Sequence, residues 1–161
     1  MQRTATNRAH RKLSSRALLA GLALVCTLAA WPARPSTRAD NLVAFRVIVH
    51  PSNALATTTR DSLSQVFFKR STRWQNGEPI RPVDLRPESA VREAFSQRVL
   101  QRSVAAVRSF WLQRVFSGRE LPPPELDSDA AVIRYVGSNR GAIGYVSGSA
   151  KIDGTKELSV H

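Results

Sequence analysis

From residue 45 onward, strand-like and helix-like segments are interspersed along the chain, and few fold classes are compatible with that order. Apolar runs predict strands at 45–49, 80–85, 142–147 and 158–161. Apolar residues at helical spacing predict helices at 57–70, 89–100, 103–116 and 127–136. Strands that alternate with helices indicate the α/β class, and connections through helices favour parallel pairing for at least some strands.

The first strand and helix are clearly marked. The run FRVIV at 45–49 is apolar throughout, as in a buried strand, and the turn HPSN follows it. Within 57–70 an apolar stripe is predicted, and either Thr58 or Thr59 is placed to cap the helix. The stripe consists of Leu63, Val66 and Phe67.

The segment IRPVDLRPESAVREAF at 80–95 leads from a strand into a helix through a short polar turn. Backbone N–H groups at a helix start lack partners within the helix, and the helix dipole adds positive charge there. Ser89 offers a hydroxyl, and Arg86 and Arg92 offer charge-assisted hydrogen bonds. Together with the backbone at Ala90, these residues predict an anion site at this helix start.

Ordinary helix capping is the alternative explanation of the same residues. With Ser89 as N-cap, Arg92 takes the third helical position, where Glu or Gln is preferred. An arginine in the first turn opposes the helix dipole, and a bound anion would offset that cost. Glu93 would offset it differently, by pairing with a nearby arginine.

Two other polar clusters follow the same logic. Ser52 and Asn53 come directly after the first strand, where ligands usually bind in open α/β sheets, although Pro-Ser-Asn is also a common turn. Asp127-Ser128-Asp129 begins the last helix. Acids suit that position and would repel an anion, so this cluster is predicted to be a cap. Between them, the prolines of 121–125 predict a stiff crossover.

The residues of this sequence give no support for catalysis or for metal binding. The sequence shows no Ser-His-acid arrangement, no HExxH motif and no phosphate loop. Cys26 is the single cysteine, and His50 and His161 have no partners at ligand spacing. We therefore expect no enzyme activity, no cofactor, no metal and no disulfide. Four large aromatics are most simply packing residues, namely Trp74, Phe110, Trp111 and Phe116.

Residues 1–39 have the pattern of a secretory signal peptide. A basic stretch without acids precedes the apolar run ALLAGLALVCTLAA at 17–30, and Thr37-Arg38-Ala39 offers a cleavage site. The run is short for a membrane span, which needs about 20 residues, so an uncleaved anchor is the weaker alternative. We expect an exported, periplasmic protein with one domain at 40–161.

The charge of that domain is modest. Residues 40–161 hold 17 basic and 12 acidic residues, a net charge of +5, whereas the whole chain carries +12. Such a balance is no signature of nucleic-acid binding. Fourteen of the basic residues are arginines, which favour bidentate contacts with carboxylate or phosphate, although a GC-rich genome explains the same bias.

Five stretches in order resemble the periplasmic phosphate-binding proteins of ABC transporters, in particular a short single-lobe branch of the type 2 periplasmic-binding-protein group. They are VIVHPSN (47–53), LSQVFFKRSTRWQNGEPIRPVDL (63–85), ESAVREAF (88–95), FWLQRVFSGRELPPPE (110–125) and NRGAIGYV (139–146). The resemblance implies one lobe of that fold, a mixed sheet with helices on both faces in three layers, and a ligand site at helix starts and strand-end loops.

The resemblance also implies how the ligand is held. In the long phosphate binders, two lobes close over the anion, and a Ser-Gly-Thr turn at a helix start donates hydrogen bonds to it. The matching positions here are Ser89, Ala90 and Val91, which keep the serine and lose the glycine and the threonine hydroxyl. A single lobe leaves its ligand exposed to water unless a second chain closes over it.

The expected function is therefore non-catalytic capture of a small oxyanion, phosphate first, as a component of phosphate uptake. The expected partners are the anion and an ABC transporter membrane component or another envelope protein, with no nucleic acid; the oligomeric state stays open. The alternative is an envelope protein-interaction module that keeps the fold but has lost ligand capture. The change at Ala90 and Val91 and the single lobe favour that alternative.

Overall fold

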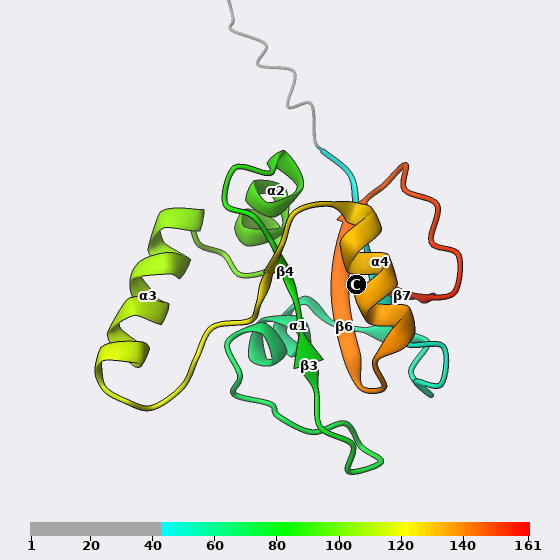
Figure 1. Cartoon of the computed structure of the whole chain (residues 1–161), viewed down its shortest axis with the longest axis horizontal. Coiled ribbons are helices and arrows are strands. Elements are labelled where there is room, and N and C mark those ends of the chain that lie inside the picture. The colour runs from blue at the N-terminus through cyan, green and yellow to red at the C-terminus, as the bar shows by residue number, and fades with distance from the viewer. Residues whose placement is uncertain (1–42) are drawn as a thin grey trace, which may run out of the picture. The chain divides into compact units, whose positions relative to one another are not determined.

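The computed structural model describes residues 43–161, so the predicted signal segment 1–39 lies outside the described residues. Figure 1 shows the elements in chain order. The strands are β1 (Phe45–Val49), β2 (Thr57–Thr58), β3 (Arg81–Pro82), β4 (Asp84–Leu85), β5 (Glu125–Leu126), β6 (Ala142–Ser147) and β7 (Lys156–Val160). The helices are α1 (Arg60–Phe67), α2 (Ala90–Arg98), α3 (Val104–Phe116) and α4 (Asp129–Ser138). None of these helices has the length and apolar character needed to cross a membrane.

One mixed sheet carries the fold, with the strand order β2-β7-β1-β6-β3. β1 lies antiparallel to β6 and β7, whereas β3 lies parallel to β6 and β4 lies parallel to β5. Between β3 and β4, Val83 N donates to Ile143 O at 2.9 Å, and Asp84 N then donates to Pro124 O at 2.9 Å. The extended chain thus has β6 along one side and β5 along the other. The predicted α/β class with parallel pairs is confirmed.

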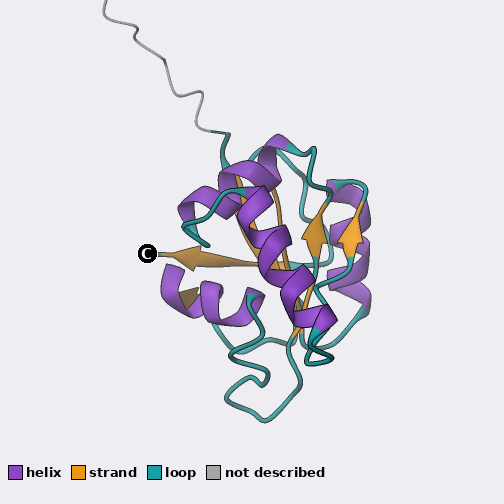
Figure 2. Cartoon of the chain, turned by 90° about the vertical axis from the view of Figure 1, so that its left-hand side faces the viewer, coloured by secondary structure: helices purple, strands orange, loops and turns teal. Residues whose placement is uncertain are grey.

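Helices cover both faces of the sheet, which makes three layers. Figure 2 shows the strands between α1 and α2 on one side and α4 on the other. Neighbouring residues of a strand point to opposite faces, and β6 uses both. A Cβ on Gly144 would lie 2.7 Å from Val132 Cγ1 of α4, whereas the next residue, Tyr145, stacks on Phe95 of α2 with ring centroids 3.8 Å apart.

Aromatic rings fill the layer between the sheet and helices α1 and α2. Phe95 lies 4.7 Å from Phe67 and 5.4 Å from Phe45, measured between ring centroids. Burying a side chain of this size stabilises the fold by roughly 1.5–3 kcal/mol. The predicted stripe of α1 is confirmed as part of this core, because all three of its residues are buried, namely Leu63, Val66 and Phe67.

Two short strands differ from the sequence predictions. Thr57 and Thr58 were predicted to be helical but pair with Ser159 and Val160 of β7, so α1 begins only after its N-cap, Thr59. Threonine is β-branched and suits a strand once a partner is present. Similarly, β5 follows the prolines of 121–125, where only a crossover was predicted. Its pairing with β4 fixes where α4 begins.

Candidate functional site

The start of α2 stands at the end of β4, where the sequence placed its first candidate site. Ser89 N donates to Arg86 O at 3.0 Å, which closes the turn between strand and helix. Ser89 is the N-cap, and its Oγ accepts a long hydrogen bond of 3.4 Å from Arg92 N. Ala90 and Val91 occupy the first turn, where backbone N–H groups have no acceptor within the helix and point out of its start.

The start of α4 adjoins the start of α2. Leu85 of β4 pairs with Leu126 of β5, so the residues after the two strands come side by side. Arg86 and Asp127 form an ion pair there, with 61% and 69% of their side-chain surfaces exposed. Ser128 is the N-cap of α4, so the cluster 127–129 is a cap, as predicted from the sequence. Two helix starts and one exposed guanidinium therefore meet at this edge of the sheet.

Acidic side chains limit the positive charge of this edge. The Asp127 carboxylate pairs with the Arg86 guanidinium, and Glu88 lies in the same turn. Asp129 is engaged by β6, because its Oδ2 accepts hydrogen bonds from Ser147 N, at 3.2 Å, and from Ser147 Oγ. An anion at the start of α2 must therefore compete with Asp127 for Arg86.

Arg92 does not lie at this edge, which corrects the sequence expectation that it flanks the helix start. Its side chain turns inward from the first turn of α2 and is 4% exposed. There the guanidinium pairs with Asp84 of β4, whose Oδ1 also accepts from Leu85 N at 3.0 Å and from the Tyr145 hydroxyl. The charge of Arg92 is thus used inside the fold and is not available to a ligand at the start of α2.

Burial changes the proton affinities of this internal cluster. It lowers the pKa of Arg92 from its ordinary value, with the nearby Tyr145 and Glu125 acting in the opposite direction. It also raises the pKa of Tyr145 well above the usual range of a phenol. Arg92 Nε and Ser96 Oγ are buried without a hydrogen-bond partner among the described residues. The cluster is a costly internal arrangement that only a well-packed fold maintains.

Ser52 and Asn53 lie at the opposite end of the sheet from Ser89. β1 is antiparallel to β6 while β3 is parallel to it, so the carboxyl ends of β1 and β3 point in opposite directions. Asn53 Oδ1 accepts from Leu55 N at 2.9 Å, and Ser52 Oγ lies 2.7 Å from His50 Nδ1. Both side chains hold their own turn, and they do not join the cluster around Ser89.

A cavity of about 470 Å³ lies between α1, β2, β7 and the loop after α1. The cavity was not predicted from the sequence, because Thr57 and Thr58 were assigned to a helix. Its lining combines apolar residues such as Leu63 and Trp74 with polar ones such as Gln65 and the cationic Arg73, and it holds no Asp or Glu side chain. Within the described part of the chain, no group of three His, Cys, Asp or Glu side chains is placed to hold a metal ion.

Solved structures of phosphate-binding proteins share this fold. The chain matches an ABC-type phosphate transport receptor of Vibrio cholerae with a TM-score of 0.56 at 17% identity, and PstS of Borrelia burgdorferi with 0.53 at 15%. A Clostridium perfringens protein, assigned as a phosphate ABC transporter substrate-binding protein and solved with bound phosphate, matches with 0.54 at 21%. The predicted periplasmic-binding-protein-like fold is thereby confirmed.

The match is partial in both directions. It covers 74% of this chain and 46–47% of those three proteins, so the chain spans about half the length of the structures it matches. The sequence itself matches no protein-family model and no curated protein. At these identities the likeness establishes the fold, and the ligand has to be argued from the residues of this chain.

Proposed function

We propose that this chain binds a small tetrahedral oxyanion, with inorganic phosphate as the first candidate, at the start of α2. The Ser89 hydroxyl, the backbone N–H groups of Ala90 and Val91 and the Arg86 guanidinium supply the hydrogen bonds. The observation that supports the proposal is the turn from Arg86 to the N-cap Ser89, closed by Ser89 N and Arg86 O, in a fold whose solved neighbours include phosphate-binding proteins. Helix starts with free N–H groups favour anions of this kind.

The proposed site excludes Arg92 and the pair Ser52 and Asn53. Arg92 is engaged by Asp84, and the Ser52 turn lies at the other end of the sheet. What remains is a shallow site with one charged donor that is already paired and largely exposed to water. Charge-assisted bonds in water are weak, so we expect a dissociation constant of roughly a millimolar.

We further propose the setting in which this binding acts. Residues 1–39 direct export, and the domain from residue 40 onward serves phosphate uptake as a non-catalytic binding component at the periplasmic side. An ABC transporter membrane component is the proposed partner. The support is the pattern of the first 39 residues together with the transport proteins among the fold neighbours.

A thermal melt of the purified protein tests the binding. A tenfold excess of phosphate over the dissociation constant adds about 1.4 kcal/mol to the free energy of unfolding. We expect a rise in the melting temperature with phosphate that exceeds the rise with equal chloride, and we expect Arg86→Met to remove it. Equal responses to every salt, or an unchanged response in Arg86→Met, would overturn the proposal.

The second candidate is the interaction module that has lost capture. Two observations favour it: Ala90 and Val91 stand where the phosphate binders have glycine and threonine, and Asp127 already occupies Arg86. This function predicts no response to any anion and the recovery of an envelope protein with the purified chain. The same melt therefore separates the two candidates.

A further inference from the structure

The exposed large apolar side chains of the described residues gather on one short segment. Between Leu112 and Leu121 they form what we call the α3 patch. Phe116 is 88% exposed and Leu121 is 70% exposed, which are unusual values for side chains of this size. The patch consists of Leu112, Val115, Phe116 and Leu121.

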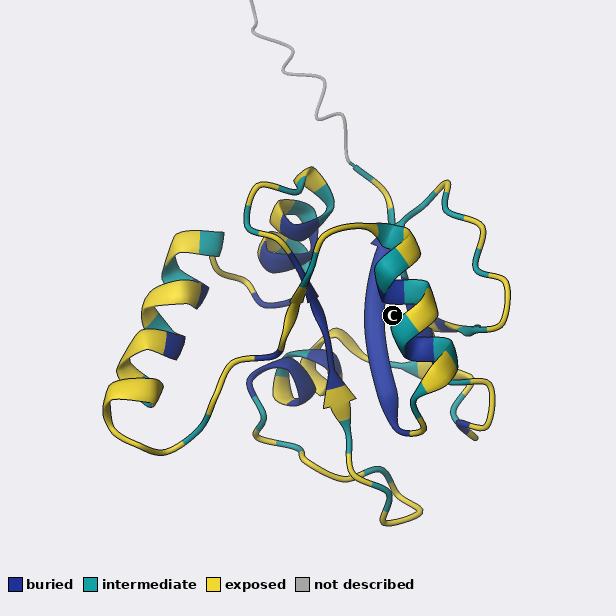
Figure 3. Ribbon diagram, viewed as in Figure 1, coloured by how far each residue is buried: buried dark blue, intermediate teal, exposed yellow. Residues whose placement is uncertain are grey.

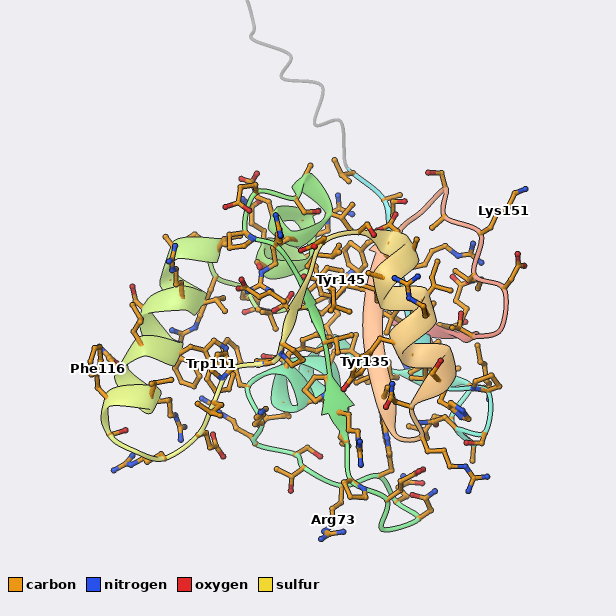
Figure 4. All side chains as sticks on the ribbon, viewed as in Figure 1. Arg73, Trp111, Phe116, Tyr135, Tyr145 and Lys151 are labelled. Carbon is orange, nitrogen blue, oxygen red and sulfur yellow. The ribbon has the colours of Figure 1, made fainter. Side chains whose placement is uncertain are left out.

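The apolar surface of helix α3 extends beyond the side that the rest of the described fold covers. Val107 and Trp111 are buried, whereas Leu112, Val115 and Phe116 face outward. Figure 3 shows the long exposed side of α3, and Figure 4 shows Trp111 pointing toward the rest of the fold while Phe116 points away from it. Large apolar side chains that share one exposed patch mark a surface for interaction, so a second surface is expected to cover this one.

Basic side chains surround the α3 patch. Lys69 Nζ donates to Leu121 O at 2.8 Å, and Arg119 lines the same shallow cavity as Leu121 and Val115. Arg108 lines the neighbouring cavity, of about 200 Å³, together with Leu112 and Val115. Arg108 lies four residues before Leu112 on the same face of α3, and Arg119 follows the end of the helix in the segment that leads to Leu121.

The charge of this surface is strongly unbalanced. The guanidiniums of Arg70 and Arg102 lie 6.0 and 5.6 Å from the ring centroid of Phe68, which packs on Phe110 of α3. Arg114 lies over Phe110. Two acids accompany these cations: Glu120, which lies 3.6 Å from Arg114, and Glu125. Next to the patch itself the cations are Lys69, Arg108, Arg114 and Arg119, against the acids Glu120 and Glu125.

We propose that the α3 patch docks on the surface of an anionic phospholipid membrane. Phe116 and Leu121 enter the headgroup layer, while Arg108, Arg119 and Lys69 contact lipid phosphates. Apolar residues beside a cluster of cations are the combination that binds such interfaces, and each cation near an anionic bilayer adds about fivefold to the affinity at low salt. The proposal uses none of the residues of the oxyanion site.

A second copy of the chain is a poorer occupant of the same surface. A symmetric pair would bring the cationic surface of one copy against that of the other, and like charges in contact oppose association. An anionic membrane presents negative charge over its whole plane, and binding to it requires no fixed arrangement of partner residues. The excess of arginines around Phe116 therefore favours the lipid surface.

Vesicle sedimentation with the full chain tests the proposal. The wild type is mixed with vesicles of phosphatidylcholine alone, or of phosphatidylcholine containing about one third phosphatidylglycerol. We expect at least about tenfold tighter binding to the anionic vesicles, and a loss of about tenfold in the double variant Phe116→Ser, Leu121→Ser. Arg119→Ser should weaken binding several-fold, whereas Arg140→Ser, which removes an exposed arginine after α4, should change it by less than about twofold. Residues 1–42 are identical in every variant, so their contribution cancels in the comparison.

Several results would overturn the proposal. These are no binding of the wild type to anionic vesicles, equal binding by the wild type and the double variant, or equal losses in Arg119→Ser and Arg140→Ser. A dimer that dissociates in Phe116→Ser would assign the patch to a second copy instead. A loss of vesicle binding in Arg86→Met, with Phe116→Ser unaffected, would assign lipid phosphate to the α2 start.

Discussion

Arg92 of α2 and Asp84 of β4 form an ion pair in which both side chains are 4% exposed. The pair joins a helix to the strand that precedes it, and the Tyr145 hydroxyl completes it by donating to Asp84. It takes the one arginine of the first turn of α2 out of the anion site and makes it part of the core.

Replacing Arg92 by Met should therefore destabilise the protein. The change leaves the Asp84 carboxylate buried without its cation, and breaking a buried pair in this way costs about 3–5 kcal/mol. Urea denaturation measures the loss. The double variant Asp84→Asn, Arg92→Met should recover much of it, because no buried charge remains. Arg86→Met, at an exposed pair, should change stability by less than about 1 kcal/mol. A stable Arg92→Met variant that no longer responds to phosphate would return Arg92 to the ligand site.

Tyr145 should make the protein sensitive to alkali. Burial raises the pKa of its hydroxyl in the folded state above the ordinary value of about 10. Below that value both states hold the proton; above it the unfolded chain releases the proton and the folded chain does not. The free energy of unfolding should then fall as the pH rises from about 10. Urea midpoints taken across this range measure the slope, and Tyr145→Phe should reduce it. An equal slope in both proteins would contradict this assignment.

Replacing Gly144, where α4 packs on β6, should destabilise the protein. A Cβ at this position would lie 2.7 Å from Val132 Cγ1 and 3.0 Å from Val83 Cγ2. Overpacking of this kind costs about 1–3 kcal/mol, so Gly144→Ala should lower the free energy of unfolding by that amount. Val132→Ala makes room for the added methyl group. The double variant should therefore be more stable than the sum of the two single losses indicates, and simple additivity would show that the contact is absent.

Asp127 should restrain anion binding at the start of α2. Its carboxylate pairs with Arg86, and both groups face water. Asp127→Asn frees the guanidinium and removes a negative charge, so we expect about threefold tighter phosphate binding by calorimetry. Asp153→Asn makes the same change in charge at an exposed position in the loop before β7 and should leave the affinity within error. Weaker binding in Asp127→Asn would mean that this carboxylate helps to hold the ligand.

Local patterns predicted those elements whose signals lie within their own residues. The strands 45–49 and 142–147 and the helix from Ser103 to Phe116 appear with the expected bounds, because apolar runs and a serine cap specify them without distant help. The two-residue strands β2 and β5 exist only through pairing with β7 and β4. A segment of two residues is too short to contain a pattern that predicts such a pairing.

The candidate site divides in the same way. Ser89 as the N-cap of α2 follows from local sequence. The inward turn of Arg92 depends on Asp84 and on Tyr145, which lies 61 residues beyond Asp84 in the chain. Likewise, Asp127 reaches Arg86 only because β5 pairs with β4. The contacts that decide which side chains a ligand can reach are long-range, and the spacing of residues along the sequence does not contain them.

A phosphate titration followed by amide NMR shifts tests most directly whether phosphate binds at the start of α2. We expect saturable shifts of the Ala90 and Val91 amides and of the Arg86 side chain, with little change at Ser52 and Asn53 and none from matched chloride. Shifts confined to residues elsewhere, or no saturable shift at Ala90 and Val91, would contradict phosphate binding there.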